Sequence, residues 1–177
     1  VPEGIRKHYI DPEGLPLADY LRYARLVQGL MYGYSLEAIR YYPKNDGSLF
    51  WMYNDTWGEV GWTIIDYYLD RKPSYYYVKR AFAPVKFILR RSGDGKRINV
   101  MGVNNTPEGK SVPIEYGYVS FEGKYDTEKT TVQLPAFTKG IVFTFDMPQV
   151  DVTEGILFVR SNETPLATLR TNPFRAY

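Results

Sequence analysis

From Pro84 onward the chain is a series of short apolar runs separated by turn sequences, and this pattern limits the fold more than any other feature. The turn sequences RSGDGK, NNTPEG, FEGKYD and FTKG are rich in Gly, Asn and Asp, which tight turns favour. Two of the runs, INVMGV and IVFTF, show the alternation of half-buried strands. The candidate strands are Val85–Arg91, Arg97–Asn104, Pro113–Phe121, Thr130–Phe137, Ile141–Phe145, Ile156–Arg160 and Leu166–Arg170.

Seven short strands in about ninety residues predict an antiparallel β-sandwich of the immunoglobulin type. Before Pro84 the chain has a different character, with long helical patterns and nearly all of the tyrosine clusters. We therefore expect two domains, residues 1–83 and residues 84–177, and a fold of the α+β class that is rich in β-structure.

The first half predicts a helix, a buried strand, a loop and a second helix. Apolar residues recur every three or four positions from Leu15 to Tyr42, as on one face of a helix. The apolar run Ser48–Asn54 is bounded by turn residues and is typical of a buried parallel strand. A helix follows Pro73 and ends before Pro84. Since one buried strand cannot form a sheet, this half resembles a slice of a larger α/β domain. The residues predicted for the buried helix face are Leu17, Leu21, Ala24, Val27, Leu30, Met31, Tyr34, Ala38 and Tyr41.

Charge and composition exclude several classes of function. The net charge is only +2, from 22 basic and 20 acidic residues, which is too balanced to indicate a nucleic-acid or anionic-membrane partner. The chain has no cysteine and a single histidine, His8, so it offers no thiolate metal site and no His-centred catalytic triad. No apolar run reaches the length of a membrane span. We expect no cofactor and no metal.

All three tryptophans, Trp51, Trp57 and Trp62, lie in the stretch GSLFWMYNDTWGEVGWTIIDYY. The polar residues Asn54 and Asp55 lie among them. An indole offers a flat apolar face for a sugar ring and an N–H group for a hydroxyl, whereas the simpler alternative is a β-rich aromatic core. Asn54 and Asp55 could bind sugar hydroxyls or the backbone of the loop.

The segment GSLFWMYNDTWGEVGWTIIDYYLDRKPSYYYVKRAFAPV resembles the end of the catalytic barrel in family 2 glycoside hydrolases, in the β-mannosidase and exo-glucosaminidase branch. In that family the last barrel strand has the form G-x-L-[YF]-W-x-x-N-D-x-W-P. A W-[ST]-x-I-D-Y-Y segment, a helix and F-A-P-V follow. Here Gly58 stands at the proline position, and LDRKP replaces the commoner glycine-containing turn. The residues that fit are Gly47, Leu49, Phe50, Trp51, Asn54, Asp55, Trp57, Trp62, Asp66, Tyr67, Tyr68, Lys79, Arg80, Phe82, Ala83, Pro84 and Val85.

The resemblance implies a C-terminal fragment of a retaining β-glycosidase that acts on terminal β-linked sugars. Residues 1–83 would be the end of its (β/α)8 barrel and residues 84–177 its sandwich domain. The partners would be a carbohydrate and the remaining domains of the parent enzyme. The resemblance alone suggests a periplasmic, secreted or lysosomal location. The implied substrate-binding residues are Trp51, Asn54, Asp55 and Trp57, and Trp62, Tyr67 and Tyr68 are interpreted as packing residues.

The family's two catalytic glutamates lie on barrel strands that this chain does not contain, so we predict no catalytic residue here and an inactive chain. Without the resemblance, Asp55 and Glu59 would be the candidate carboxyl pair, because retaining hydrolysis needs two carboxyls about 5–5.5 Å apart. The Asn162–Glu163 pair imitates the family's acid/base motif, but we interpret it as a hairpin turn. The alternative function is a non-catalytic carbohydrate-binding or structural β-sandwich module.

Overall fold

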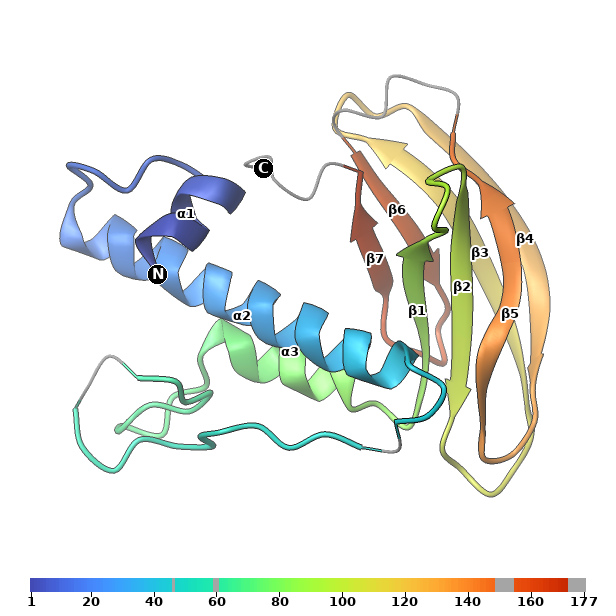
Figure 1. Cartoon of the computed structure of the whole chain (residues 1–177), viewed down its shortest axis with the longest axis horizontal. Coiled ribbons are helices and arrows are strands. Elements are labelled where there is room, and N and C mark those ends of the chain that lie inside the picture. Colours follow the sequence, from blue (N-terminus) through green and yellow to red (C-terminus); the bar gives the residue numbers. More distant parts are fainter. Residues whose placement is uncertain (46, 59–60, 149–154, 172–177) are drawn as a thin grey trace. The chain divides into compact units, whose positions relative to one another are not determined.

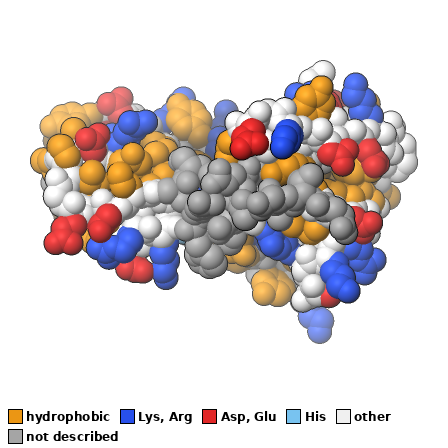
Figure 2. All heavy atoms as spheres, turned by 90° about the horizontal axis from the view of Figure 1, so that it is seen from above, with side chains coloured by type: hydrophobic (Ala, Val, Ile, Leu, Met, Phe, Trp, Pro, Cys, Tyr) orange, Lys and Arg blue, Asp and Glu red, His pale blue; other side chains and the backbone are white. Residues whose placement is uncertain are grey.

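The computed structural model describes residues 1–45, 47–58, 61–148 and 155–171. The chain forms two compact units, one made by Val1–Phe82 and one that begins at Ala83 (Figure 1). The first unit is helical and the second is made of strands. The charges of both signs are interspersed on the face shown in Figure 2, in keeping with the small net charge.

The first unit holds three helices, α1 (Pro2–His8), α2 (Leu17–Tyr41) and α3 (Pro73–Ala81). The sequence predicted α2 and α3 but not α1. Both α1 and α3 carry a proline in the first turn, where a missing N–H group costs no helix hydrogen bond. None of the described helices is long and apolar enough to cross a membrane.

Two glycines let α3 approach α2 closely. A Cβ atom at Gly29 would lie 2.6 Å from the ring of Tyr77, and one at Gly33 would lie 2.9 Å from it. The face of α2 that the sequence predicted is only partly correct, since Leu17, Met31 and Tyr34 are exposed. Apolar periodicity missed the contact face because glycine does not register as apolar packing surface. The buried residues of α2 are Val27, Gly29, Gly33 and Leu36.

The predicted buried strand at Ser48–Asn54 is absent from the structure. This segment is extended, but its only bridge among the described residues joins Asn54 to Ile65. Burial alternates along it, with Phe50 half-buried and its neighbours Leu49 and Trp51 exposed. The physical reason is that a buried parallel strand needs partners on both edges and both faces. The described residues supply one half-covered face and a single bridge.

The described part of the second unit contains seven strands, which confirms the predicted antiparallel sandwich. One sheet has the order β1–β2–β5 and the other the order β4–β3–β6–β7 (Figure 1). In the immunoglobulin constant arrangement the fourth strand belongs to the first sheet, whereas here β4 pairs with β3. The strands are β1 (Val85–Arg91), β2 (Arg97–Asn104), β3 (Lys110–Ser120), β4 (Tyr125–Leu134), β5 (Thr138–Asp146), β6 (Gly155–Arg160) and β7 (Ala167–Arg170).

The sandwich core lies between the two sheets and is built from alternate residues of the strands. Phe87 and Leu89 of β1, Val112 of β3, and Leu157 and Val159 of β6 are all essentially inaccessible to solvent. In β1, β2, β4 and β6 the buried core residues are two positions apart, as expected where one face of a strand packs on the core.

Candidate functional site

The candidate site is the aromatic loop, which we define as residues 48–72, between α2 and α3. Its two arms are joined by backbone hydrogen bonds: the Asp55 amide donates to the Ile65 carbonyl at 3.1 Å, and the Ile65 amide donates to the Tyr53 carbonyl at 3.1 Å. The Lys72 amide donates to the Ile64 carbonyl at 3.0 Å and joins the second arm to the start of α3. Backbone hydrogen bonds therefore connect the described residues of the loop despite their lack of regular structure.

Three side chains of the loop form a buried polar cluster. Asp55 is 4% exposed, and its Oδ2 atom accepts hydrogen bonds from the Thr63 hydroxyl at 2.7 Å and from Lys72 Nζ at 3.2 Å. Lys72 Nζ also donates to the Thr63 hydroxyl oxygen at 2.6 Å. A buried carboxylate is costly unless it is paired and hydrogen-bonded, and this cluster meets both conditions for Oδ2. The Oδ1 atom has no hydrogen-bond partner among the described residues.

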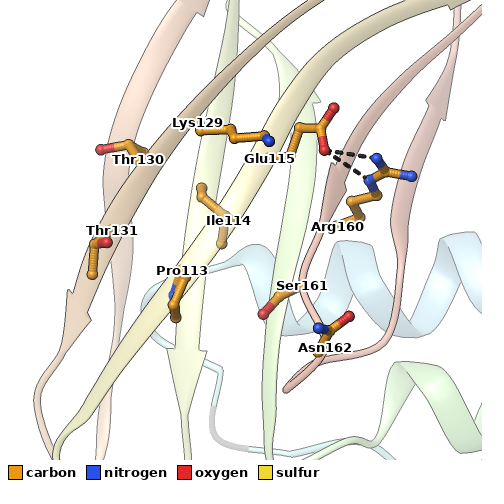
Figure 3. A pocket seen from close by; sticks show the side chains of 9 residues that line it. All are labelled: Pro113, Ile114, Glu115, Lys129, Thr130, Thr131, Arg160, Ser161 and Asn162. Carbon is orange, nitrogen blue, oxygen red and sulfur yellow. Dashed lines mark hydrogen bonds and ion pairs between the residues drawn. The ribbon is translucent and has the colours of Figure 1, made fainter.

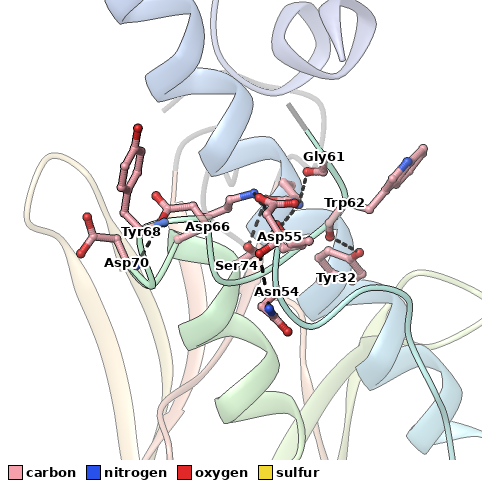
Figure 4. A network of polar contacts seen from close by, with 12 residues as sticks. Tyr32, Asn54, Asp55, Gly61, Trp62, Asp66, Tyr68, Asp70 and Ser74 are labelled. Atoms are coloured by element: carbon pink, nitrogen blue, oxygen red, sulfur yellow. Dashed lines mark hydrogen bonds and ion pairs between the residues drawn. The ribbon is translucent and has the colours of Figure 1, made fainter. Parts of the chain in front are cut away.

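Two polar side chains of α2 hold the second arm of the loop. The Gln28 side-chain amide donates to the carbonyls of Gly61 and Thr63, at 3.4 and 3.1 Å. The Tyr32 hydroxyl lies 2.6 Å from the Trp62 carbonyl and 2.9 Å from the Trp51 carbonyl (Figure 4). Burial raises the pKa of Tyr32 above its ordinary value, so its hydroxyl stays protonated and can donate.

All three tryptophan side chains are displayed to solvent. Trp51 is 76% exposed, Trp57 is 64% exposed and Trp62 is 71% exposed. Asn54 is also exposed, and its side-chain amide makes a long hydrogen bond of 3.4 Å to the Asp55 carbonyl. Large apolar side chains are usually buried, so three exposed indoles close together in the sequence make this loop the candidate binding surface.

The structure therefore separates the four predicted binding residues into two groups. Trp51, Asn54 and Trp57 lie exposed on the loop, whereas Asp55 is buried beneath it. Trp62, Tyr67 and Tyr68, which were interpreted as packing residues, are exposed in this chain, so their packing role stays a prediction. In the sequence they lie between Asp55 and Lys72 of the polar cluster.

Sequence reasoning missed the residues that support the loop, which are Gln28, Tyr32, Thr63 and Lys72. Gln28 and Tyr32 are four residues apart and so lie on one face of α2, which is the only signal that could have found them. Lys72 lies in LDRKP, where the turn differs from the family pattern, but nothing in the sequence indicates that its ammonium group is buried.

Neither the Asp55–Glu59 carboxyl pair nor the Asn162–Glu163 motif gains support as a catalytic site. Glu59 lies outside the described residues, so the distance from Asp55 to Glu59 is not defined. Asn162 and Glu163 lie in the exposed turn between β6 and β7, in agreement with the hairpin interpretation. Asn162 lines a hollow of about 610 Å³ on the sandwich (Figure 3). In this hollow Arg160 donates two hydrogen bonds to the Glu115 carboxylate, at 2.7 and 3.0 Å, and they lower the pKa of Glu115.

Neither a second carboxylate nor a metal site accompanies that ion pair. Glu115 is the one acidic residue that lines the hollow. Across the described residues there is no group of three or more His, Asp or Glu side chains that could hold a metal ion. The aromatic loop thus remains the best candidate site.

Comparison with known proteins identifies the group to which this arrangement is related. A scan of protein-family models finds no match. β-Mannosidase B of Aspergillus niger is 47% identical over 45 residues, which are 25% of this chain and 5% of the relative. The crystal structure of a β-D-mannosidase from Dictyoglomus thermophilum matches 97% of this chain with 32% identity and a TM-score of 0.84. The chain is similar to β-mannosidases of glycoside hydrolase family 2.

This similarity confirms the resemblance to the β-mannosidase branch that the loop motif predicted. The structure of the exo-chitosanase of Amycolatopsis orientalis matches 94% of the chain at 20% identity with a TM-score of 0.65, which shows a shared fold. The chain spans only 22% of the Dictyoglomus β-mannosidase and 5% of the Aspergillus relative. These relatives are glycoside hydrolases of much greater length.

Proposed function

We propose that the chain is part of a retaining β-glycosidase that acts on terminal β-linked sugars, with β-mannosides as the first substrates to test. The observation that carries the proposal is the set of three exposed tryptophans on one loop, in a chain that matches a β-mannosidase structure over 97% of its length. Residues 1–83 would contribute to the end of a catalytic barrel, and residues 84–177 would form a sandwich domain.

In this proposal the exposed loop residues bind the sugar. Pyranose C–H groups pack on an indole face, and the indole N–H donates to a hydroxyl, which suits Trp51 and Trp57. The exposed amide of Asn54 can both donate to and accept from sugar hydroxyls. Asp55 has a supporting role in this proposal and does not contact the sugar. Its carboxylate accepts hydrogen bonds from Thr63 and Lys72 and thereby fixes the neighbouring loop residues.

The chain supplies no catalytic residue in this proposal. Retaining hydrolysis needs an acid/base carboxyl and a nucleophile about 5–5.5 Å apart. Asp55 forms an ion pair with Lys72, and its hydrogen-bond partners among the described residues include no second carboxylate. The two glutamates would lie in other parts of a longer protein, so the 177-residue chain alone should not hydrolyse aryl β-mannosides.

The test compares Trp51→Ala with wild type in the complete gene product that contains this chain. We expect kcat/KM for an aryl β-mannoside to fall about thirtyfold to a thousandfold, equivalent to about 2–4 kcal/mol. In the 177-residue chain the melting temperature should hardly change, because the Trp51 side chain is 76% exposed there. A large drop in melting temperature with normal kcat/KM would instead make Trp51 a packing residue.

A second measurement tests the assignment of catalysis. Hydrolysis by the purified 177-residue chain above the buffer background, abolished by Asp55→Asn, would place the chemistry inside this chain. Absence of any β-glycosidase activity in the complete gene product would favour the alternative of a non-catalytic carbohydrate-binding or structural module.

A further inference from the structure

The further inference concerns how the tryptophan backbones are held. Gln28 and Tyr32 lie one turn apart on α2, so both side chains face the same part of the aromatic loop. Together they reach the carbonyls of the three consecutive residues 61–63. Consecutive carbonyls of an extended segment point in different directions, so their capture by one helix face fixes the orientation of the segment.

Tyr32 also connects the two arms of the loop. Its hydroxyl oxygen lies 2.9 Å from the Trp51 carbonyl and 2.6 Å from the Trp62 carbonyl, so those two oxygens can be at most 5.5 Å apart, the sum of the two distances. A phenol has a single proton and donates to one carbonyl at a time, and Trp62 offers the shorter contact. The Tyr32 hydroxyl therefore lies between the two tryptophan carbonyls and can donate to either of them, with the shorter contact to Trp62.

Both supporting residues are themselves anchored. The Tyr32 ring packs edge-on against Phe50, with ring centroids 5.6 Å apart and an interplanar angle of 65°. The side-chain oxygen of Gln28, Oε1, accepts a hydrogen bond of 3.0 Å from the hydroxyl of Ser74, a buried residue of α3. A side chain that is itself fixed by packing or by a hydrogen bond positions its hydrogen-bond partner more firmly than a mobile surface side chain does.

We propose that Tyr32 is a positioning residue that presents Trp51 and Trp62 as two walls of one sugar-binding pocket, and that Trp62 therefore contacts the sugar together with Trp51. Gln28 assists by fixing the residues on either side of Trp62. The Trp62 indole is 71% exposed while its backbone carbonyl is held, which is the arrangement that a contact residue requires. This inference rests on the proposed function for the identity of the ligand, a β-mannoside, but not for the positioning itself.

The positioning is tested on the 177-residue chain labelled with 5-fluorotryptophan. Three tryptophans give three ¹⁹F resonances, each assigned by replacing one tryptophan with phenylalanine. Tyr32→Phe keeps the ring and removes the hydroxyl, so we expect the Trp51 and Trp62 resonances to shift or broaden while that of Trp57 stays in place. Gln28→Met should move the Trp62 resonance and leave Trp51 in place, which provides a second variant should Tyr32→Phe fold poorly.

Tyr20→Phe is the matched control, since Tyr20 lies on the same helix and its side chain makes no hydrogen bond within the described structure. Unchanged Trp51 and Trp62 resonances in Tyr32→Phe, or equal changes in Tyr20→Phe, would overturn the positioning role. Circular dichroism on each sample separates a local change from a loss of helix.

The sugar contact is tested in the complete gene product with an aryl β-mannoside. Tyr32→Phe and Trp62→Ala should each lower kcat/KM about tenfold, mainly through a higher KM, with the melting temperature nearly unchanged. Normal kinetics for Trp62→Ala would refute the contact. If the gene product has no β-glycosidase activity, the proposed function fails separately, and a D-mannose titration followed on the Trp62 resonance decides the contact: a saturable shift supports it and no shift overturns it.

Discussion

The aromatic loop and the β-sandwich are stabilised in different ways. The sandwich satisfies its backbone through strand ladders and buries a cluster of twelve side chains. The described residues of the loop form only isolated bridges, and they are held by side chains such as Gln28, Tyr32 and Asp55. The buried cluster of the helical unit contains four residues. The sandwich is thus built as a self-sufficient scaffold, whereas the loop is built to display side chains.

This difference predicts that the sandwich folds alone and the helical unit does not. A protein comprising residues 84–177 should melt cooperatively, because its twelve-residue core lies between two sheets of its own. Residues 1–83 should show no cooperative transition, since the buried apolar cluster among the described residues has only four members to support long helices and an exposed aromatic loop. Calorimetry on the two proteins measures this, and a sharp transition in residues 1–83 with none in residues 84–177 would reverse the comparison.

The second prediction compares the ion pairs of the two regions. Lys72 and Asp55 form a pair whose side chains are 9% and 1% exposed. Lys72→Met should lower the free energy of unfolding by about 3–5 kcal/mol, because it leaves the Asp55 carboxylate buried without its cation. Urea unfolding followed by tryptophan fluorescence measures the change, and all three tryptophans lie in the loop concerned.

The matched control is Arg160→Met in the sandwich, where the Arg160 side chain is 64% exposed. Exposed pairs contribute little, so we expect its unfolding midpoint to match that of wild type. An equal effect of the two substitutions would show that the buried cluster has no special role in the loop. The double variant Lys72→Met, Asp55→Leu should recover part of the loss, because no unpaired charge remains.

The same difference explains why one region could be predicted from the sequence and the other could not. Strands β1 and β2 were predicted at their observed bounds, since local apolar runs and turn residues define them. The predicted strand at Ser48–Asn54 is absent, because whether an apolar run becomes a strand depends on neighbours that the run itself does not specify.

The candidate site shows the same division between residue type and environment. The tryptophans and Asn54 were identifiable because their clustering is visible in the sequence. Gln28, Tyr32 and Lys72 were not, because a polar residue on a helix or before one normally faces water. Their roles follow from tertiary contacts across more than fifteen positions, for example from Lys72 to Asp55. The sequence motif identifies the exposed tryptophans, whereas the residues that hold their backbones are identified only by the structure.

The third prediction concerns a titrating contact in the sandwich. The Tyr116 hydroxyl donates to the Glu128 carboxylate at 2.6 Å, and this bond, more than burial, raises the pKa of Tyr116 to about 12. The folded pKa lies above the unfolded value of about 10, so the stabilisation is complete below pH 10 and is lost as the pH rises toward 12.

The substitution Glu128→Gln should lower the pKa of Tyr116 toward its ordinary value, because it removes the charge that opposes ionisation. NMR with ¹³Cζ-labelled tyrosine measures this between pH 9 and 12. Tyr32 of the helical unit also has a raised pKa, but the cause there is burial alone, so Glu128→Gln should leave it unchanged. A Tyr116 pKa that is indifferent to Glu128 would contradict the assigned cause.

The smallest expected effect comes from one strained residue in each region. Leu69 in the loop has φ = 67°, and Phe137 before β5 has φ = 48°, a left-handed conformation that disfavours residues with a Cβ atom. Both side chains are largely exposed, so little packing is lost on truncation. Leu69→Gly and Phe137→Gly should each raise the free energy of unfolding by about 0.5–1 kcal/mol, after allowance for the greater entropy of glycine in the unfolded chain.

The pair of variants also sharpens the comparison between the regions. Asp66 holds the Leu69 bend by accepting hydrogen bonds of 3.0 Å from the amides of Tyr68 and Asp70, so the bend does not depend on the Leu69 side chain. Chemical denaturation measures both variants against Leu69→Ala, which keeps a Cβ atom and should show no gain. Destabilisation by Leu69→Gly together with stabilisation by Phe137→Gly would contradict this account of Leu69. It would mean that the exposed Leu69 side chain makes a stabilising contact, and that the shape of the loop depends on its exposed side chains as well as on its hydrogen bonds.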